Sequence, residues 1–153
     1  MTLTFRQMIP GDIPAALDVR FSTVENAITL EELDRGYGIT PASLAASLEA
    51  DVRGWLCEDG GRAVGFAMAD RSNGEIQVVA VRPSHEGRGI GKALLERVTE
   101  WLFDNGYSEI WLGANPDPAV RASGFYKKYG WRRTGVIKRG DEVLKLRKAD
   151  RVG

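Results

Sequence analysis

The chain has 153 residues, of which 43% are hydrophobic and 27% are charged, as is typical of a globular protein rather than a disordered one. Its 21 Lys and Arg residues balance 21 Asp and Glu residues, so net charge favours neither a nucleic-acid nor a membrane partner, and we expect neither. With one cysteine, Cys57, and one histidine, His85, an intramolecular disulfide is excluded and we expect no metal site.

The chain begins with a predicted strand and helix. Residues from Thr2 to Met8 alternate in side-chain character, which is typical of a strand, and Pro10-Gly11 ends it. We expect a helix to follow with Asp12 as its N-cap. Its apolar side chains lie at helical spacing: Ile13, Leu17, Phe21 and Val24.

A second helix is predicted after an acidic segment. The segment from Glu25 to Ile39 is broken by glycines and reads as irregular or only partly helical. Thr40-Pro41 then combines a capping hydroxyl with a proline in the first turn, which indicates a helix start. Leu44 and Leu48 share one face of that helix.

In the middle of the chain the apolar period changes from 3.6 to 2. This pattern predicts three strands, which are Arg53–Glu58, Arg62–Asp70 and Glu75–Arg82. The segments between them are rich in glycine and asparagine, the residues that tolerate the positive φ of tight hairpin turns. Three consecutive strands joined by hairpins predict an antiparallel N-terminal half of the sheet.

The rest of the chain alternates helices and strands. Apolar side chains form one stripe from Ile90 to Asn105, and a second helix should begin at Asp117-Pro118 and end at Gly130. The remaining strands are Glu109–Ala114, Trp131–Lys138 and Glu142–Arg147. The order of elements predicts an α/β domain in which the helix Ile90–Asn105 connects one parallel pair of strands.

The sequence between the Glu75–Arg82 strand and the next helix favours an anion. Gly87, Gly89 and Gly91 occupy alternate positions directly before and within the first helical turn. Glycine lets a ligand approach the backbone, and the free amides and dipole of the helix start favour negative charge. Arg88 and Lys92 add two positive charges there.

Two common nucleotide motifs do not fit this loop. The dinucleotide motif G-x-G-x-x-G fails, because Lys92 or Leu94 stands where the third glycine is needed. The ATP and GTP loop G-x-x-x-x-G-K-[ST] fails at Glu86, in place of its first glycine, and at Ala93, in place of the hydroxyl that binds magnesium. A nucleoside triphosphate is therefore disfavoured.

The stretch Glu86-Gly-Arg-Gly-Ile-Gly91 instead resembles the pyrophosphate-binding motif [Q/R]-x-x-G-x-[G/A] of GNAT acetyltransferases, with Glu86 where Gln or Arg is usual. The resemblance implies acetyl-CoA as the co-substrate. Residues Glu86 to Lys92 (Glu86, Gly87, Arg88, Gly89, Ile90, Gly91 and Lys92) would then cradle its pyrophosphate. The main chain of Val79 and Val81 would bind the pantetheine arm.

A second stretch, Ala122-Ser-Gly-Phe-Tyr-Lys-Lys-Tyr-Gly-Trp131, resembles the C-terminal signature A-x-x-x-Y-x-x-x-G-[F/W] of the same family. By that resemblance Tyr126 is the hydroxyl near the coenzyme sulfur, where a phenol can protonate the departing thiolate. The alternative is that Tyr126 is a core aromatic. The asparagine usual in the family is Ala119 here, and we expect Asn115 to supply a similar polar contact to the coenzyme.

The resemblance also sets expectations for the whole domain. It implies a single GNAT-like domain over residues 1–153 with a mixed, mostly antiparallel sheet of about seven strands and helices on both faces. Residues 1–52 would form the acceptor side and 53–148 the coenzyme-binding core. Homodimers are common in this family, although nothing in the sequence identifies an interface.

The acceptor is expected to be a primary amine of a small molecule or peptide. A lysine-like amine is only about one part in 10³ neutral at pH 7, which amounts to about 4–5 kcal/mol. Enzymes reduce this cost by desolvating the amine or by passing its proton to a base through water. Glu25 is the candidate base. The acidic residues that follow would attract a cationic substrate, namely Glu31, Glu32 and Asp34; alternatively they are simply solvated.

Several alternatives stay open at this point. The same fold can transfer a longer acyl group, or can bind an acyl-CoA without catalysis as a sensor or interaction domain. His85 lies next to the coenzyme loop and either touches a phosphate or has no special role. Four nearby basic residues either meet the coenzyme 3′-phosphate or form a solvated face: Lys127, Lys128, Arg132 and Arg133.

The location in the cell follows from cysteine content and hydropathy. A single cysteine is typical of a reducing compartment. The first twelve residues lack the basic and then apolar pattern of a signal peptide. No stretch approaches the roughly 18 apolar residues of a membrane span. We therefore expect a cytoplasmic protein.

Overall fold

The computed structural model describes residues 2–23, 35, 38–117 and 121–151. In this part of the chain seven strands form one sheet in the order β1-β2-β3-β4-β5-β7-β6. The strands are β1 (Leu3–Gln7), β2 (Val52–Asp59), β3 (Arg62–Asp70), β4 (Glu75–Val81), β5 (Glu109–Ala114), β6 (Arg132–Lys138) and β7 (Asp141–Arg147). All neighbouring strands are antiparallel except β4 and β5, which are parallel. The predicted α/β fold with a mixed, mostly antiparallel sheet is confirmed.

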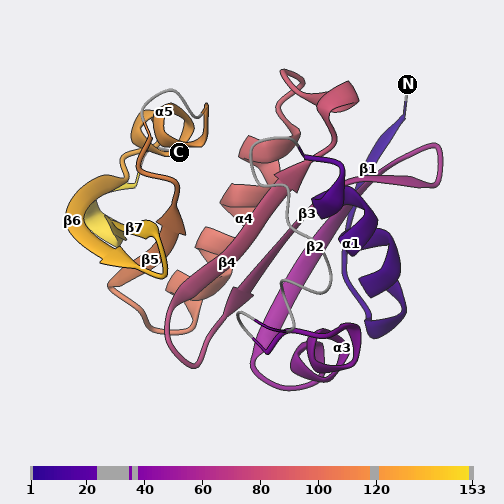
Figure 1. The fold of residues 1–153 in the computed structure, drawn as a ribbon, viewed down its shortest axis with the longest axis horizontal. Helices are drawn as coiled ribbons and strands as arrows, with labels where there is room; N and C mark the ends of the chain where they lie inside the picture. Colours follow the sequence, from indigo (N-terminus) through magenta and orange to yellow (C-terminus); the bar gives the residue numbers. More distant parts are fainter. Residues whose placement is uncertain (1, 24–34, 36–37, 118–120, 152–153) are drawn as a thin grey trace.

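Helices cover both faces of this sheet (Figure 1). The helices α1 (Ile13–Phe21) and α3 (Pro41–Leu48) pack on one face, and α4 (Ile90–Asp104) and α5 (Arg121–Lys128) pack on the other. Short 3₁₀ turns precede α1 at Pro10–Asp12, precede α4 at Pro83–His85 and follow β7 at Lys148–Asp150. Thr40 caps α3 as predicted, because its side chain accepts a hydrogen bond from the Ser43 amide.

Strand β3 lies at the centre of both hydrophobic cores. Its side chains alternate, so that Ala67 and Ala69 join the core under α4, while Phe66 and Met68 join the core under α1 and α3. Gly65 lets α4 approach the sheet closely: a Cβ at that position would lie 2.9 Å from Ile90 Cγ2. The start of α4 is therefore held directly against β3.

The parallel strands β4 and β5 meet at one end only. Their only paired residues in the described sheet are Glu75 and Trp111, and the Trp111 amide also bonds to the Gly74 carbonyl at 3.1 Å. Beyond this point the strands diverge, as Figure 1 shows. The edge of β4 that faces β5 therefore carries main-chain groups without a strand partner from Val78 onward in the described sheet.

Some local details differ from the sequence expectations. Asp12 occupies the N-cap position of α1 as predicted, but its side chain does not cap the helix. It is the last residue of the 3₁₀ turn, and its carboxylate accepts two hydrogen bonds from Arg6 and one from the Ile9 amide. Phe21, which shares the helical spacing of Ile13 and Leu17, is 36% exposed at the end of α1. Strand β4 ends at Val81, one residue before the predicted end, and Pro83 begins a 3₁₀ turn directly after Arg82.

Candidate active site

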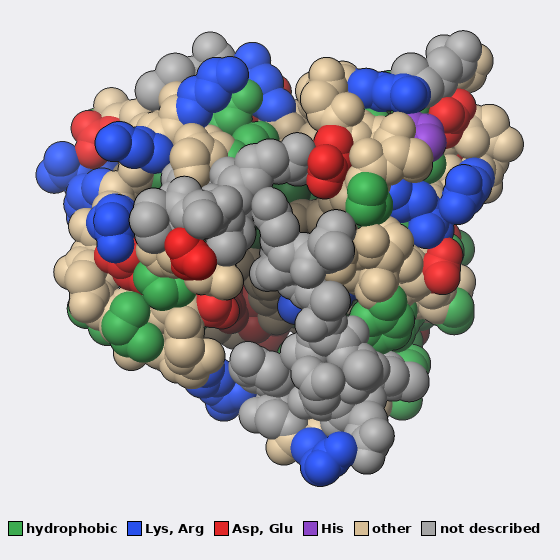
Figure 2. Space-filling model, turned by 45° about the horizontal axis from the view of Figure 1, so that its top comes forward, with side chains coloured by type: hydrophobic (Ala, Val, Ile, Leu, Met, Phe, Trp, Pro, Cys, Tyr) green, Lys and Arg blue, Asp and Glu red, His purple; other side chains and the backbone are tan. Residues whose placement is uncertain are grey.

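The divergence of β4 and β5 opens a cavity of about 740 Å³. Its walls come from four segments that are separate in the chain: the end of α1, the end of β4 with Val79 and Val81, the turn and first residues of α4, and the C-terminal half of α5. In Figure 2 the surface is hollowed between its two halves, and Lys and Arg side chains gather on either side at the top of the view. The structure thus places both sequence motifs at one cavity.

The start of α4 is suited to bind an anion. Gly87 and Gly89 have φ of 75° and 79°, a conformation that glycine adopts without strain, and a Cβ at either would meet nothing within 4 Å. No side chain of the described residues caps the helix, and Ala93 is the first residue whose amide bonds back to Gly89. The preceding amides therefore have no acceptor within the helix and remain available to a phosphate.

Two side chains hold this turn from below. Arg82 is 8% exposed and donates to the Ala63 carbonyl at 2.7 Å and to Asp18 at 2.6 Å, which joins the turn to β3 and α1. His85 contacts Asp59 through its Nε2 at 2.9 Å, and this hydrogen bond lowers the pKa of the Asp59 carboxyl. His85 therefore links the turn to the end of β2, and it also lines the cavity, so contact with a phosphate stays a prediction.

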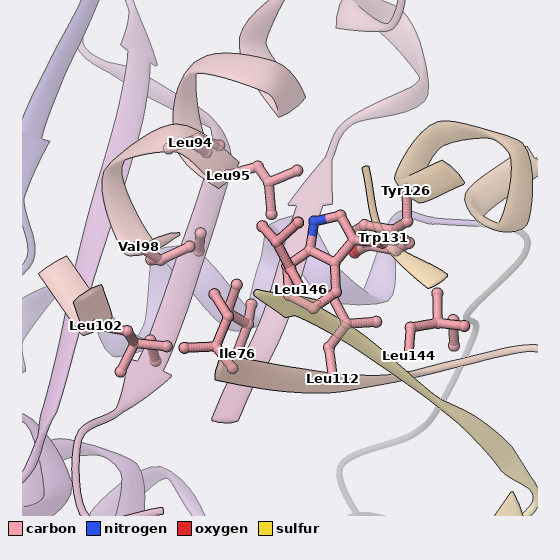
Figure 3. Packing of buried hydrophobic residues seen from close by; sticks show 14 of the residues in the cluster. Ile76, Leu94, Leu95, Val98, Leu102, Leu112, Tyr126, Trp131, Leu144 and Leu146 are labelled. Carbon is pink, nitrogen blue, oxygen red and sulfur yellow. The ribbon is translucent and has the colours of Figure 1, made fainter. Parts of the chain in front are cut away.

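Tyr126 lines the cavity from α5 and is 9% exposed. Its ring packs at right angles to Phe125 and Trp131, within the cluster of Figure 3 that includes Leu144 and Leu146. Burial raises its pKa to about 12, and its hydroxyl makes no hydrogen bond to the described residues. The phenol is therefore protonated at neutral pH, with its proton available to a group in the cavity.

The other predicted coenzyme residues divide into two groups. The side chains or backbone of Glu86, Gly87, Gly89, Ile90, Gly91 and Lys92 line the cavity. Arg88 is exposed beside the turn and Asn115 lies at the end of β5, and neither is among the lining residues in the described part of the chain. The Asn115 side chain instead accepts a hydrogen bond from the Asp117 amide.

Of the four basic residues near α5, the cavity wall contains one. Lys128 lines the cavity, whereas Arg132 pairs with Glu109 and Arg133 pairs with Glu142 on the sheet. Lys128 also lies 5.8 Å from the centre of the Tyr129 ring. Among these residues, Lys128 is thus the one placed to meet a phosphate in the cavity.

A second cavity of about 490 Å³ lies between α1, α3, β4, β5 and the β6–β7 hairpin. Two half-buried carboxyl groups line it, from Glu75 at the start of β4 and Asp141 at the start of β7. Burial is the largest cause of the raised pKa of both groups. The sequence analysis missed both residues, since each follows a turn and reads as a surface position. Glu25 lies outside the described residues.

The two cavities adjoin each other across β4. Val78 lines the second cavity and Val79, the next residue, lines the first, while Arg20 on α1 lines both. Among the described residues no group of three His, Cys, Asp or Glu side chains is arranged to hold a metal. No helix in the described ranges is both long and apolar enough to cross a membrane.

Comparisons with known proteins agree with this architecture. The model of the Acetyltransferase (GNAT) family matches residues 23–131. A mycothiol acetyltransferase of Pseudarthrobacter chlorophenolicus is 30% identical over 144 residues, which are 86% of this chain and 43% of that protein. An uncharacterized N-acetyltransferase of Methanocaldococcus jannaschii is 33% identical over 95 residues, 55% of this chain and 41% of that protein. The chain thus spans less than half the length of these relatives.

Solved structures show the same fold at lower identity. The PaiA N-acetyltransferase of Thermoplasma acidophilum, solved in complex with coenzyme A, superposes with a TM-score of 0.78 at 16% identity, over 96% of this chain and 99% of that one. The ribosomal-protein-S18-alanine N-acetyltransferase of Escherichia coli gives 0.72 at 20% identity, over 95% and 94%. With a family model that matches most of its residues, the chain belongs to the Acetyltransferase (GNAT) family.

Proposed function

We propose that the protein is an acetyl-CoA-dependent N-acetyltransferase that moves the acetyl group to a primary amine of a small molecule or peptide. The amine would attack the thioester directly while both substrates are bound. The observation that carries this proposal is the pair of cavities that adjoin across β4. The first, here called the coenzyme cavity, offers backbone amides and lysines to an anionic co-substrate. The second, here called the acceptor cavity, offers carboxyl groups to an amine.

The first cavity fits the parts of acetyl-CoA in turn. The uncapped start of α4, with Gly87 and Gly89, would hold the pyrophosphate. The unpaired main-chain edge of β4 at Val79 and Val81 would hydrogen-bond the amides of the pantetheine arm. Acetyl-CoA supplies the acetyl group as a thioester, and the residues of this chain bind and orient it.

Proton transfer at the two ends of the reaction falls to different residues. Tyr126 is protonated at neutral pH and lines the coenzyme cavity, so it would donate its proton or a hydrogen bond to the departing thiolate. Glu75 lines the acceptor cavity, and its raised pKa makes it a better base than an ordinary surface carboxylate. Glu25 stays a prediction for the same task.

The experiment is a calorimetric titration of the protein with acetyl-CoA, with ATP and NAD as controls, followed by an amine screen with the same protein. Gly91 offers a matched pair of variants. A Cβ there would lie 3.5–3.7 Å from Phe125 and Val81, at ordinary contact distance, so Gly91→Ala fits. The extra methyl groups of Gly91→Val need space that these neighbours occupy or that the ligand would use.

We expect micromolar binding of acetyl-CoA alone, close to wild type in Gly91→Ala and weakened at least tenfold in Gly91→Val. Because alanine forms helices better than glycine, Gly91→Ala should also raise the free energy of unfolding by about 0.5–1 kcal/mol. No binding to any acyl-CoA would overturn the proposal. Binding without turnover on a broad amine panel would favour the non-catalytic acyl-CoA sensor instead.

A further inference from the structure

The acceptor cavity has one apolar wall and one charged wall. The apolar wall comes from α1, α3 and β3, with Leu17, Leu44, Phe66 and Met68 among its members. Four charged side chains come from the opposite side, namely Glu75 on β4 and Lys138, Arg139 and Asp141 of the β6–β7 hairpin. Arg20 on α1 adds one positive charge from the side of the apolar wall. A ligand that fills this cavity must therefore carry an apolar body and charged groups at one end.

Asp141 is placed in the cavity by the bare backbone of β5. A Cβ on Gly113 would lie 3.2 Å from Asp141 Cβ and 3.5 Å from its Oδ2, so glycine leaves the room that this carboxyl occupies. Within the described residues the Asp141 carboxyl makes no hydrogen bond or ion pair. Burial raises the pKa of the Asp141 carboxyl, and the charge of Arg20, which also lines the cavity, opposes this shift only in part. An ammonium group would give this carboxylate the partner it lacks there.

The cations of the hairpin, Lys138 and Arg139, would repel an ammonium group and therefore do not bind one. Lys138 lies 4.5 Å from the centre of the Trp111 ring, and both Lys138 and Arg139 act electrostatically on Glu75. Cationic side chains beside an acceptor cavity instead favour an anionic group on the ligand. The lining is thus complementary to a ligand that bears both charges.

The conformation of the hairpin turn supports a role for Arg139. Its φ is 54° and that of Gly140 is 85°, and Arg139 is the one non-glycine residue with positive φ in the described part of the chain. Turns of this kind favour Asn or Asp at the first position, and an arginine there is strained. Such strain is concentrated at ligand sites, and this arginine lines the cavity.

We propose that the acceptor carries an amine and a carboxylate on an apolar body, as an apolar α-amino acid does, and that the β6–β7 hairpin selects it. Asp141 receives the ammonium group, and Lys138 and Arg139 receive the carboxylate. The apolar side chain of the acceptor lies against Phe66 and Met68. This inference rests on the proposed acetyl transfer, and it goes further by naming the class of acceptor and the residues that determine specificity.

The test compares L-leucine, L-leucinamide and 3-methylbutylamine as acceptors at saturating acetyl-CoA. These compounds share the apolar body and differ in the carboxylate. We expect kcat/KM for leucine to exceed that for 3-methylbutylamine at least tenfold. In Arg139→Asn and Lys138→Gln the ratio of kcat/KM for leucine to kcat/KM for leucinamide should fall at least fivefold, because each variant removes a cation that receives the carboxylate. Comparing variants by this ratio cancels the different basicities of the amines.

The controls separate recognition from folding. Arg139→Asn keeps a residue that the turn favours, so a loss of leucine specificity in it cannot come from a broken hairpin. Lys148→Gln removes an exposed cation that lines neither cavity, and it should leave the ratio unchanged. Asp141→Asn should raise KM for all three amines at least tenfold with little change in KM for acetyl-CoA, whereas the exposed Asp51→Asn should not.

Two failures are distinguishable. Turnover in which leucinamide or 3-methylbutylamine equals leucine, or in which Arg139→Asn and Lys138→Gln leave the ratio unchanged, would overturn the inference and leave the acetyl transfer standing. Absence of acetyl transfer to every amine in a broad panel would remove the proposed function itself.

Discussion

At the scale of single residues, burial in the two cavities raises the pKa of groups that could transfer a proton. Tyr126 is buried among Phe125 and Trp131, and its pKa is raised to about 12, so it holds its proton at neutral pH. Burial also raises the pKa of Glu75, which brings a carboxylate closer to the basicity that proton transfer near pH 7 requires. A proton donor and a proton acceptor therefore lie in adjoining cavities.

Replacing Tyr126 with Phe tests the donor. We expect kcat to fall about 10²-fold, the range typical of a lost general acid, with KM for acetyl-CoA nearly unchanged. The hydroxyl has no hydrogen-bond partner among the described residues, so stability should change by less than about 1 kcal/mol. Steady-state kinetics and thermal unfolding on the same preparation measure both, and an unchanged kcat would reduce Tyr126 to a packing residue.

The pH dependence of the rate tests Glu75. As the pH falls through the raised pKa of Glu75, the base is protonated and kcat/KM for the amine should fall. In Glu75→Gln this fall of kcat/KM at low pH should disappear, and the plateau of kcat/KM at higher pH should drop about 10²-fold. A pH–rate profile of both proteins decides the matter. A fall of kcat/KM at low pH that persists in Glu75→Gln would assign the base elsewhere, with Glu25 as the next candidate.

At the scale of elements, the turn between β4 and α4 forms the proposed coenzyme site. Its glycines give the backbone freedom, yet the turn is held in place by Arg82 below it and by the contact of His85 with Asp59. Gly65 brings the start of α4 directly onto β3. The glycines thus line the cavity, while Arg82 and His85 fix where the helix starts.

Arg82 and Asp18 form a matched pair for testing this anchor. Arg82→Met leaves the buried Ala63 carbonyl without its 2.7 Å donor, and we expect the free energy of unfolding to fall by about 1–3 kcal/mol. Asp18→Asn changes a side chain that is 72% exposed and should cost less than about 0.5 kcal/mol. Urea unfolding measures both; equal losses would mean that the ion pair, rather than the carbonyl contact, holds the turn.

At the scale of the whole molecule, one parallel pair of strands creates both cavities. Strands β4 and β5 meet only at Glu75 and Trp111 and then separate, so the coenzyme cavity opens on one side and the acceptor cavity adjoins it across β4. The acceptor cavity carries two carboxyl groups that burial disfavours in their charged form. A charged pocket of this kind is expected to reduce stability in exchange for function.

The pH dependence of unfolding tests this cost. The ordinary pKa values of Glu75 and Asp141 are 4.5 and 3.8, and both are raised in the folded protein, so the folded state binds more protons than the unfolded state above those values. The contribution of these groups to the free energy of unfolding therefore falls as the pH rises from their ordinary pKa values through their raised pKa values in the folded protein. We expect Glu75→Gln and Asp141→Asn to raise the melting temperature at pH 7, with a gain that shrinks as the pH approaches about 4. A constant gain at all pH values would contradict this origin.

The features that the sequence determined by itself are local. The strands β3 and β5 have the predicted bounds, and the stripe of α4 is buried at Ile90, Leu94 and Leu102 as its period requires. The loop proposed to bind the coenzyme could be located in the sequence because its glycines, its charges and the helix start are neighbours in the chain. Period and spacing carry this information, since each depends on residues only a few positions apart.

The acceptor cavity was decided by the tertiary structure alone. Glu75 and Asp141 belong to strands far apart in the chain, and both read as turn-flanking surface residues. Only the pairing of β5 with both β4 and β7 brings them to one cavity. Asp12 and Arg82 were misjudged for the same reason, because their partners Arg6 and Ala63 lie across a turn or on another strand. Burial and charge partners depend on which distant segments meet, and no local pattern in the sequence specifies that.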